Sequence, residues 1–322
     1  MKKIFYYVFA AFAACAMTSC ESGNPEFDDF EYQTVYFAYQ TPLRTVELGK
    51  DQEVDLTLDN QHKVRVTATM GGSYGNKRDI RVRIAVDPTL CQGLKFDNGT
   101  PVEVLPTEYY SMASNEIVIP AGSILGGVEV QLTDAFFNDP KALTANYVLP
   151  VRMLSIVSGA DSITAGKDYV LYALKYVNKY HAHYLRRGVD NVTVNGTASA
   201  NVRHKEYVEY DESVAMTTTS LNGNCLPLAF KDEAGKDHTV NLMLSFSPDG
   251  QCTVSSGTGG VEVQGSGRFV ENGAKKAVGG KDCDVMYLDY NVKLNAGVTY
   301  STKDTLVMEA RGIKPETFTV TK

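Results

Sequence analysis

The sequence predicts an all-β protein, in which a β-sandwich is followed by an antiparallel meander that we expect to close into a barrel. Apolar and polar residues alternate with a period of two from Thr34 onward, and Gly, Pro, Asn and Asp interrupt the alternation at short intervals. Residues 79–86, for example, read DIRVRIAV, which indicates a strand with one dry and one wet face. Short strands at this spacing are typical of a sandwich, and only residues 135–145 have weak helical character.

The first 19 residues have the three parts of a bacterial secretory signal. Lys2 and Lys3 form a basic start, an apolar run covers residues 4–17, and Thr18 and Ser19 are small. The apolar run of 14 residues is shorter than the roughly 20 that cross a bilayer as a helix. We therefore expect residues 1–19 to be a signal peptide that is removed.

Cys20 follows these small residues directly. The stretch Ala16-Met17-Thr18-Ser19-Cys20 resembles the lipobox of bacterial lipoproteins, with Met17 where Leu is commoner. We expect Cys20 to carry a diacylglycerol and an N-acyl chain, since stable anchoring takes more than one chain. The alternative is an ordinary signal peptide that happens to contain Cys20.

Residues 20–33 are expected to be the lipidated Cys and a flexible spacer. Five acidic residues fall between positions 21 and 31. Acidic residues directly after a lipidated Cys are similar to the signal that sends Bacteroidetes lipoproteins to the outer face of the outer membrane. That resemblance places the protein in the cell outer membrane, lipid-anchored and facing outward.

Two domains of different fold follow the spacer. The predicted sandwich covers residues 34–177, and the strand pattern breaks at residues 178–180. The second domain, residues 181–322, has longer hairpins, including one in which Pro248-Asp249-Gly250 presets a tight turn. Because sequential antiparallel strands form a meander, closure into a barrel would remove its open edges. The halves share no internal repeat.

Three segments of the first domain resemble a known family. Residues 103–112 (EVLPTEYYSM), 117–122 (IVIPAG) and 146–151 (NYVLPV) look like the N-terminal domain of Bacteroidetes surface lipoproteins linked to polysaccharide utilisation. The resemblance implies an immunoglobulin-like sandwich with no assigned activity. Residues 180–189 (YHAHYLRRGV) resemble the opening strand of a calycin-like, lipocalin-type barrel, although the usual Gly-x-Trp is absent because the chain contains no Trp.

Composition and motifs argue against several function classes. The formal net charge is −7, so the chain has no basic footprint for nucleic acid. No phosphate-binding loop, dinucleotide motif or serine-hydrolase elbow occurs, and we expect neither a cofactor nor catalysis. His181 and His183 are two residues apart, a weak metal signal for which a polar interdomain segment is the preferred explanation, and no metal site is predicted. Cys252 and Cys283 could form a disulfide or remain buried free thiols.

Binding remains as the predicted activity. The chain has 19 Tyr and 13 Phe, and aromatic rings are platforms for sugar rings. The tyrosines nearest predicted barrel strands are candidate ligand contacts at one mouth of the barrel, although each could instead be a core residue: Tyr184, Tyr207, Tyr210, Tyr287 and Tyr290.

The family resemblance implies a non-catalytic surface lipoprotein that binds polysaccharide or oligosaccharide as an accessory to glycan uptake. Its expected partners are a glycan ligand, the membrane through the lipid, and an importer complex. The alternative is an adhesion or envelope structural protein that binds another protein. A hydrolase whose acids come together from distant loops ranks third.

Overall fold

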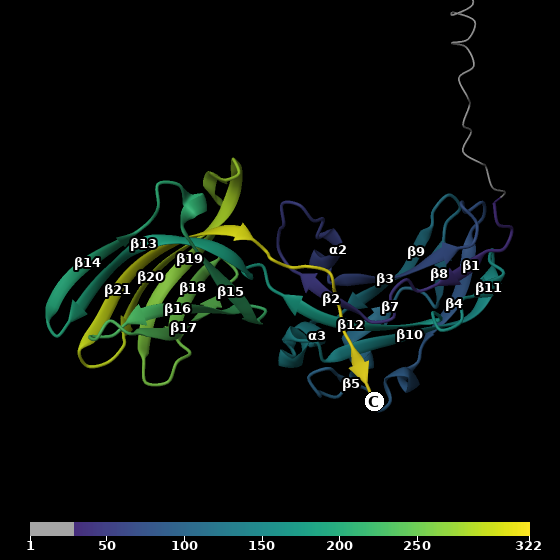
Figure 1. Ribbon diagram of the computed structural model, residues 1–322, viewed down its shortest axis with the longest axis horizontal. Coiled ribbons are helices and arrows are strands. Elements are labelled where there is room, and N and C mark those ends of the chain that lie inside the picture. The colour runs from purple at the N-terminus through teal and green to yellow at the C-terminus, as the bar shows by residue number, and fades with distance from the viewer. Residues whose placement is uncertain (1–28) are drawn as a thin grey trace, which may run out of the picture.

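The computed structural model describes residues 29–322, so the predicted signal peptide and Cys20 lie outside the described residues. Two β-rich units lie next to each other along the long axis of the molecule (Figure 1). The unit nearer the N-terminus is a sandwich of two sheets, and the other is a closed antiparallel barrel. The predicted all-β fold class is therefore confirmed.

The sandwich consists of a five-stranded and a seven-stranded sheet. The first contains, in spatial order, β11 (Ser162–Ile163), β1 (Thr34–Tyr36), β3 (Lys63–Gly71), β9 (Leu125–Leu132) and β7 (Tyr110–Met112). The second contains β22 (Glu316–Thr317), β2 (Pro42–Glu47), β12 (Tyr169–Val177), β10 (Tyr147–Ser158), β4 (Ile80–Val86) and β8 (Glu116–Ile119), with β6 (Glu103–Val104) beside β10.

Alternation explains how these strands pack. Every second residue of β3 and β4 is buried, while the residues between them point toward solvent. The central strands β10 and β12 bury both faces. One face packs in the main core, and the other packs in a second, smaller cluster that includes Val148 and Leu171.

Short helices cover the ends of the strands. The segment with predicted helical character contains α3 (Asp134–Asn138) and η3 (Pro140–Leu143), and α3 buries Phe136 and Phe137 in the main core. The other short helices are α2 (Thr57–Asn60), η1 (Pro88–Cys91), η2 (Thr107–Tyr109) and η4 (Val208–Tyr210).

Eight strands close the barrel, because its first strand pairs with its last from His183 to Val194. The ring contains β13 (Ala182–Val194), β15 (Glu212–Ser220), β16 (Gly223–Lys231), β17 (Asp237–Phe246), β18 (Gln251–Ser256), β19 (Glu262–Val278), β20 (Lys281–Lys293) and β21 (Val298–Ala310). A ninth strand, β14 (Thr197–Arg203), pairs with the half of β13 that β15 leaves free.

The barrel is packed on the inside and partly covered on the outside. Its interior cluster contains Cys252 together with Leu242 and Met286, whereas a smaller cluster outside the wall contains Cys283 and Leu185. All four described cysteines are free thiols. The open choice between a disulfide and buried thiols is thus resolved, since Cys252 and Cys283 belong to clusters on opposite sides of the barrel wall.

The C-terminal tail leaves the barrel and returns to the sandwich (Figure 1). After Ala310, β22 pairs with β2, and β23 (Val320–Thr321) pairs with β5 (Lys95–Phe96). The rings of Phe318 and Phe96 lie 5.3 Å apart between centroids. The segment assigned to the second domain, residues 181–322, therefore ends in a tail that pairs with the first.

Candidate functional site

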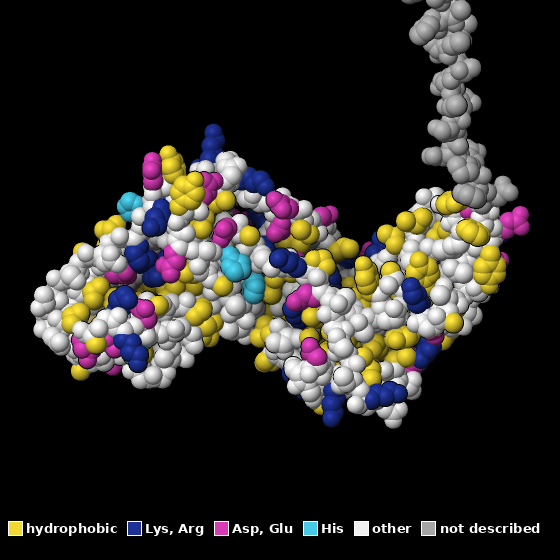
Figure 2. All heavy atoms as spheres, viewed as in Figure 1, with side chains coloured by type: hydrophobic (Ala, Val, Ile, Leu, Met, Phe, Trp, Pro, Cys, Tyr) yellow, Lys and Arg dark blue, Asp and Glu magenta, His cyan; other side chains and the backbone are white. Residues whose placement is uncertain are grey.

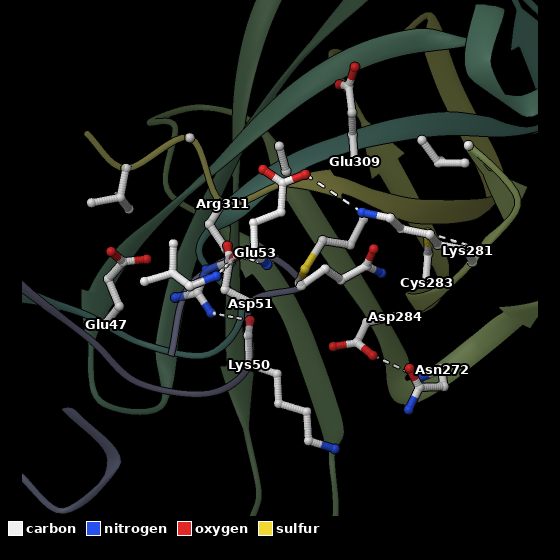
Figure 3. Close-up of a pocket in the computed structure, with 18 residues that line it drawn as sticks. Glu47, Lys50, Asp51, Glu53, Asn272, Lys281, Cys283, Asp284, Glu309 and Arg311 are labelled. Carbon is white, nitrogen blue, oxygen red and sulfur yellow. Dashed lines mark hydrogen bonds and ion pairs between the residues drawn. The ribbon is translucent and has the colours of Figure 1, made fainter. Parts of the chain in front are cut away.

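A cavity of about 560 Å³ lies at the junction of the two units (Figure 3). One wall comes from residues 47–54, which follow β2, and the other from residues 278–284 and 308–313 of the barrel. Lys281 Nζ of the barrel lies 3.6 Å from Glu53 Oε1 of the sandwich. These mixed charges suit a small polar molecule, but none of the lining residues is aromatic, so the cavity offers no stacking platform for a sugar ring.

Arg311 lines this cavity and is only 4% exposed. Its guanidinium donates hydrogen bonds to the carbonyl oxygens of Leu48 at 3.1 Å, Lys50 at 3.3 Å and Asn178 at 2.9 Å. Burial lowers the pKa of Arg311, and Glu47 partly offsets this effect. Because its contacts join the end of β21 to both the segment after β2 and the interdomain linker, Arg311 holds the two units together.

Of the two candidate histidines, His181 already has a hydrogen-bond partner. The backbone N–H of Thr218 donates to Nδ1 of His181 at 3.2 Å, so this ring nitrogen is already used, while His183 is exposed. Within residues 29–322, no three His, Cys, Asp or Glu side chains are grouped to hold a metal ion. No helix in the described part of the chain is long and apolar enough to cross a membrane.

We expect His181 to make folding stability depend on pH. Burial, together with the charge of Arg311, lowers the pKa of His181 from 6.5 to about 4. As pH falls between these values, the unfolded chain takes up a proton that the folded chain does not, so stability decreases. Urea midpoints at about pH 7 and about pH 5 should therefore differ less for His181→Gln than for the parent chain.

The pH dependence of stability must be compared with that of the parent chain, because Glu47 changes the stability in the opposite direction as pH falls. Burial raises the pKa of Glu47, so its protonation favours the folded state as pH falls. This contribution is present in both chains and cancels in the comparison. Equal pH dependence of the two chains would contradict the role of His181.

Inside the barrel, charged side chains form a network. Asp304 accepts hydrogen bonds from Arg186 Nε at 3.1 Å, Arg203 Nη2 at 2.7 Å and the Tyr290 hydroxyl at 2.7 Å. Arg203 also donates to both carboxylate oxygens of Asp190, at 2.7 and 2.9 Å. Burial opposes ionisation of Asp190, but the hydrogen bonds from Arg203 and Thr302 outweigh it and lower its pKa. The network fills this part of the interior with paired charges.

The outer wall of the barrel presents a different surface, which we call the Tyr287 face. Residues directly opposite one another on β19, β20, β21 and β13 form a row, in the order Arg268, Tyr287, Thr305 and Arg187. A shallow hollow of about 470 Å³ opens over the first three, and its other lining side chains include Gln251, Asp289 and Lys303. Tyr287 is 44% exposed, so an apolar ring lies among hydrogen-bonding groups.

Tyr207 and Tyr210 stand beside this face. Both are more than half exposed, and their ring centroids lie 6.0 Å apart in an edge-to-face arrangement. Arg187 Nε donates to Asp211, the residue after η4, at 2.6 Å. Arg187 is two strands from Tyr287 in the same row, a separation of about 10 Å. The structure therefore brings three of the five predicted tyrosines to one side of the barrel.

The other two predicted contacts are core residues. Tyr184 and Tyr290 are fully buried, and the hydroxyl of Tyr184 donates to the carbonyl oxygen of Tyr180 at 2.9 Å. Burial excludes both residues as ligand contacts, which corrects the prediction for them. A ligand at the barrel mouth is likewise not supported, because side chains fill the interior. The sequence analysis did not identify the charged residues of the Tyr287 face, because a single charged residue on a strand is indistinguishable in sequence from any other solvent-exposed position.

Two family models match the chain. One, described as an N-terminal domain, matches residues 30–159, and the other, a domain of unknown function (DUF5627), matches residues 179–312. No curated protein matches the chain.

Solved structures give one strong and several weak similarities. A protein of unknown function from Bacteroides ovatus is 45% identical, with a TM-score of 0.84, over 91% of this chain and 99% of that one. An auxiliary nutrient binding protein from Bacteroides thetaiotaomicron is 15% identical, with a TM-score of 0.39, over 83% of this chain and 90% of that one. A multidomain protein including DUF1735 from Bacteroides ovatus is 14% identical, with a TM-score of 0.42, over 86% and 94%. TM-scores of 0.39 and 0.42 support no conclusion about the function of this chain.

Proposed function

Since this chain belongs to the same family as the Bacteroides ovatus protein of unknown function, we propose its function from the surface itself: it binds polysaccharide or oligosaccharide on the Tyr287 face without catalysis. The observation that carries the proposal is the exposed ring of Tyr287 within a shallow hollow lined by hydrogen-bonding side chains. A sugar has C–H faces that stack on an aromatic ring and hydroxyls that need polar partners.

The polar groups around Tyr287 match this requirement. Arg268 and Thr305 lie on the neighbouring strands directly opposite Tyr287, and one residue row further along Asp289 and Lys303 form an ion pair at 3.3 Å. Arginine and lysine donate hydrogen bonds and carboxylates accept them, so a sugar hydroxyl finds a partner both as acceptor and as donor. The row continues through Arg187 toward Tyr207 and Tyr210, which gives a long ligand room to extend.

Binding without chemistry fits the open shape of this face. Enzymes surround reacting groups with preorganised dipoles in sites that exclude water. The Tyr287 face instead lies on the outside of the barrel, where Asp289 and Lys303 keep more than half of their side-chain surface exposed. We therefore assign the protein a capturing role, as an accessory to glycan uptake.

The proposed location follows from the N-terminus. Lipidation of Cys20, with the residues directly after it as a spacer, would hold the protein on the outer face of the outer membrane. There it could deliver captured glycan to an importer complex. These assignments rest on the sequence motif at positions 16–20.

Removal of the Tyr287 ring should weaken glycan binding several-fold. Stacking on one ring contributes about 1 kcal/mol, by analogy with aromatic pairs, which corresponds to about a fivefold change in Kd. Calorimetry with Tyr287→Ala, across a panel of host and dietary glycans that includes a ligand of the parent chain, measures the effect. Tyr39→Ala is the matched control, because Tyr39 is 67% exposed and lies on the sandwich.

Two outcomes decide against the proposal. Equal losses for Tyr287→Ala and Tyr39→Ala would show that the Tyr287 face is not the binding site. Failure of the parent chain to bind any glycan would favour the adhesion alternative, in which the partner is another protein.

A further inference from the structure

The end of the sandwich farthest from the barrel exposes a group of apolar side chains, which we call the apolar tip. Each member is at least half exposed, and Tyr74 reaches 73%. The apolar tip consists of Phe30, Tyr32, Tyr74, Ile124 and Leu125. Figure 2 shows hydrophobic side chains gathered on this end, around the place where the described chain begins. Exposed apolar groups that gather in this way mark interaction surfaces.

Hydrogen bonds connect the loops that carry the apolar tip. The backbone N–H of Tyr74 donates to Asp29 at 2.7 Å, and the side chain of Gln33 donates to Ser73 at 2.8 Å. The buried side chain of Asn76 donates to the carbonyl oxygens of Pro120 at 2.8 Å and Ser123 at 3.1 Å, which joins the β3–β4 loop to the β8–β9 loop.

Glycine allows the closest of these approaches. Gly72 has a φ of +99°, and a Cβ atom at this position would lie 2.0 Å from the carbonyl oxygen of Tyr32. The chain segment before β1 can therefore pack directly on the β3–β4 loop. The apolar side chains are thus exposed from a cross-linked group of loops.

The position of the apolar tip points to a lipid surface as its partner. Phe30 is ten positions after Cys20 in the sequence, and a fully extended chain spans at most about 36 Å over ten positions. If Cys20 is lipidated, which is part of the proposed function, the apolar tip cannot lie farther than this from the bilayer. The barrel lies at the opposite end of the long axis (Figure 1).

The composition of the apolar tip agrees with a membrane interface. Aromatic rings are favoured at the level of lipid headgroups, and aliphatic side chains enter the acyl boundary. Lys77 and Arg78 are exposed beside Tyr74 and can reach lipid phosphates. Four acidic residues also lie here: Asp29, Glu31, Asp79 and Asp161. All but Glu31 accept a backbone hydrogen bond, Asp29 from Tyr74 at 2.7 Å, Asp161 from Gln33 at 2.7 Å and Asp79 from Ala121 at 2.9 Å. With both signs of charge present, apolar contact dominates.

We propose that the apolar tip docks into the headgroup region of the membrane that carries the lipid anchor. Docking orients the molecule with its long axis pointing away from the bilayer and holds the Tyr287 face out toward soluble glycan. The anchor supplies most of the affinity, and the apolar tip sets the orientation.

A fluorescence experiment can test this orientation, because the chain contains no Trp. The Tyr74→Trp variant places one reporter in the apolar tip. The Tyr210→Trp variant is the matched control, since Tyr210 is 68% exposed on the barrel. The chain from Glu21 to Lys322, which holds all described residues, is attached through an N-terminal histidine tag to phosphatidylcholine vesicles that contain a nickel-chelating lipid. This tether replaces the native lipid, so the result is independent of Cys20 modification.

We expect the emission of Tyr74→Trp to shift to shorter wavelength and to fall about twofold when the lipids carry brominated acyl chains, because interfacial side chains enter the acyl boundary. Emission of Tyr210→Trp should not change. Adding Ile124→Glu and Leu125→Glu to the Tyr74→Trp chain should restore its emission. Absence of quenching in Tyr74→Trp, or equal quenching in both single variants, would overturn the proposal.

Two further outcomes are distinguishable. Self-association of the untethered chain through the apolar tip, seen by sedimentation and abolished by the two glutamate substitutions, would assign the surface to a second copy and overturn docking. No glycan is present in the assay, so its failure leaves glycan binding intact, and failure of glycan binding leaves docking intact.

Discussion

Replacing Asp304 with Asn should lower the free energy of unfolding of the barrel by about 3–5 kcal/mol. Asp304 is 3% exposed and accepts hydrogen bonds from two arginines and a tyrosine. Asparagine keeps the size of the side chain but removes its charge. Arg186, whose side chain is 5% exposed, then keeps a long hydrogen bond to the Tyr290 hydroxyl at 3.4 Å and an ion pair with the exposed Glu212 at 3.6 Å. A buried cation left without its partner is strongly destabilising.

Two free thiols can report the unfolding of each domain separately. Cys252 lies in the barrel core, and burial raises its pKa to about 12, so the folded barrel should keep it unreactive. Cys91 lies in the sandwich and has a pKa raised by burial to about 11. Pulsed thiol labelling at increasing urea concentrations, read by peptide mass, gives a midpoint for each. Asp304→Asn should move the Cys252 midpoint to lower urea and shift the Cys91 midpoint less.

The matched control is an ion pair on the barrel surface. Glu262 Oε1 lies 2.9 Å from Lys293 Nζ, and both side chains are more than half exposed. Glu262→Gln should cost less than about 1 kcal/mol, because exposed pairs contribute little. If Asp304→Asn costs no more than Glu262→Gln, the interior network does not stabilise the barrel.

The strands were predictable because their local pattern and their packing agree. Residues 79–86, predicted as a strand with one dry and one wet face, contain β4 from Ile80 to Val86, in which buried and exposed residues alternate. In β21 the alternation of buried and exposed residues follows the barrel wall. A period of two is a local property, so it survives without knowledge of which strands become neighbours.

The interior charges and the contacts between units could not be predicted in the same way. Arg186, Asp190 and Asp304 read as solvated positions on a strand, and only closure of the barrel buries them together. The tail strands β22 and β23 are two residues long, too short to show any period. Arg311 is likewise a single residue whose partners come from three distant backbone positions.

The candidate tyrosines could have been separated further from sequence alone. Tyr287 and Tyr290 are three residues apart on one strand, so an alternating pattern places them on opposite faces. Both could not contact one ligand. The structure places Tyr287 outside and Tyr290 inside. The alternation alone does not show which face points into the barrel. The inner face is identified by Met286, Leu288 and Val292, which lie in the same core cluster as Tyr290.

Replacing Cys20 with Ala should release the protein from the membrane and abolish incorporation of a palmitate analogue. Cys20 is the residue on which we expect both the thioether-linked and the N-linked chains, so one substitution removes every anchor. Acyl chains contribute about 0.8 kcal/mol for each buried methylene group. The apolar tip offers only a few partly exposed side chains, which should not hold the unlipidated chain through washing. Metabolic labelling and membrane fractionation of the native host measure both effects.

Cys15 provides the control for this experiment, because it lies in the predicted signal peptide five residues earlier. Cys15→Ala should remain labelled and membrane-bound, since the small residues before Cys20 are unchanged. Loss of labelling in Cys20→Ala with retention in the membrane would mean that protein contacts, including the apolar tip, are sufficient for attachment. Persistence of both label and membrane attachment in Cys20→Ala would show that residues 1–19 are not a lipoprotein signal and would remove the anchor from which the expected location is inferred.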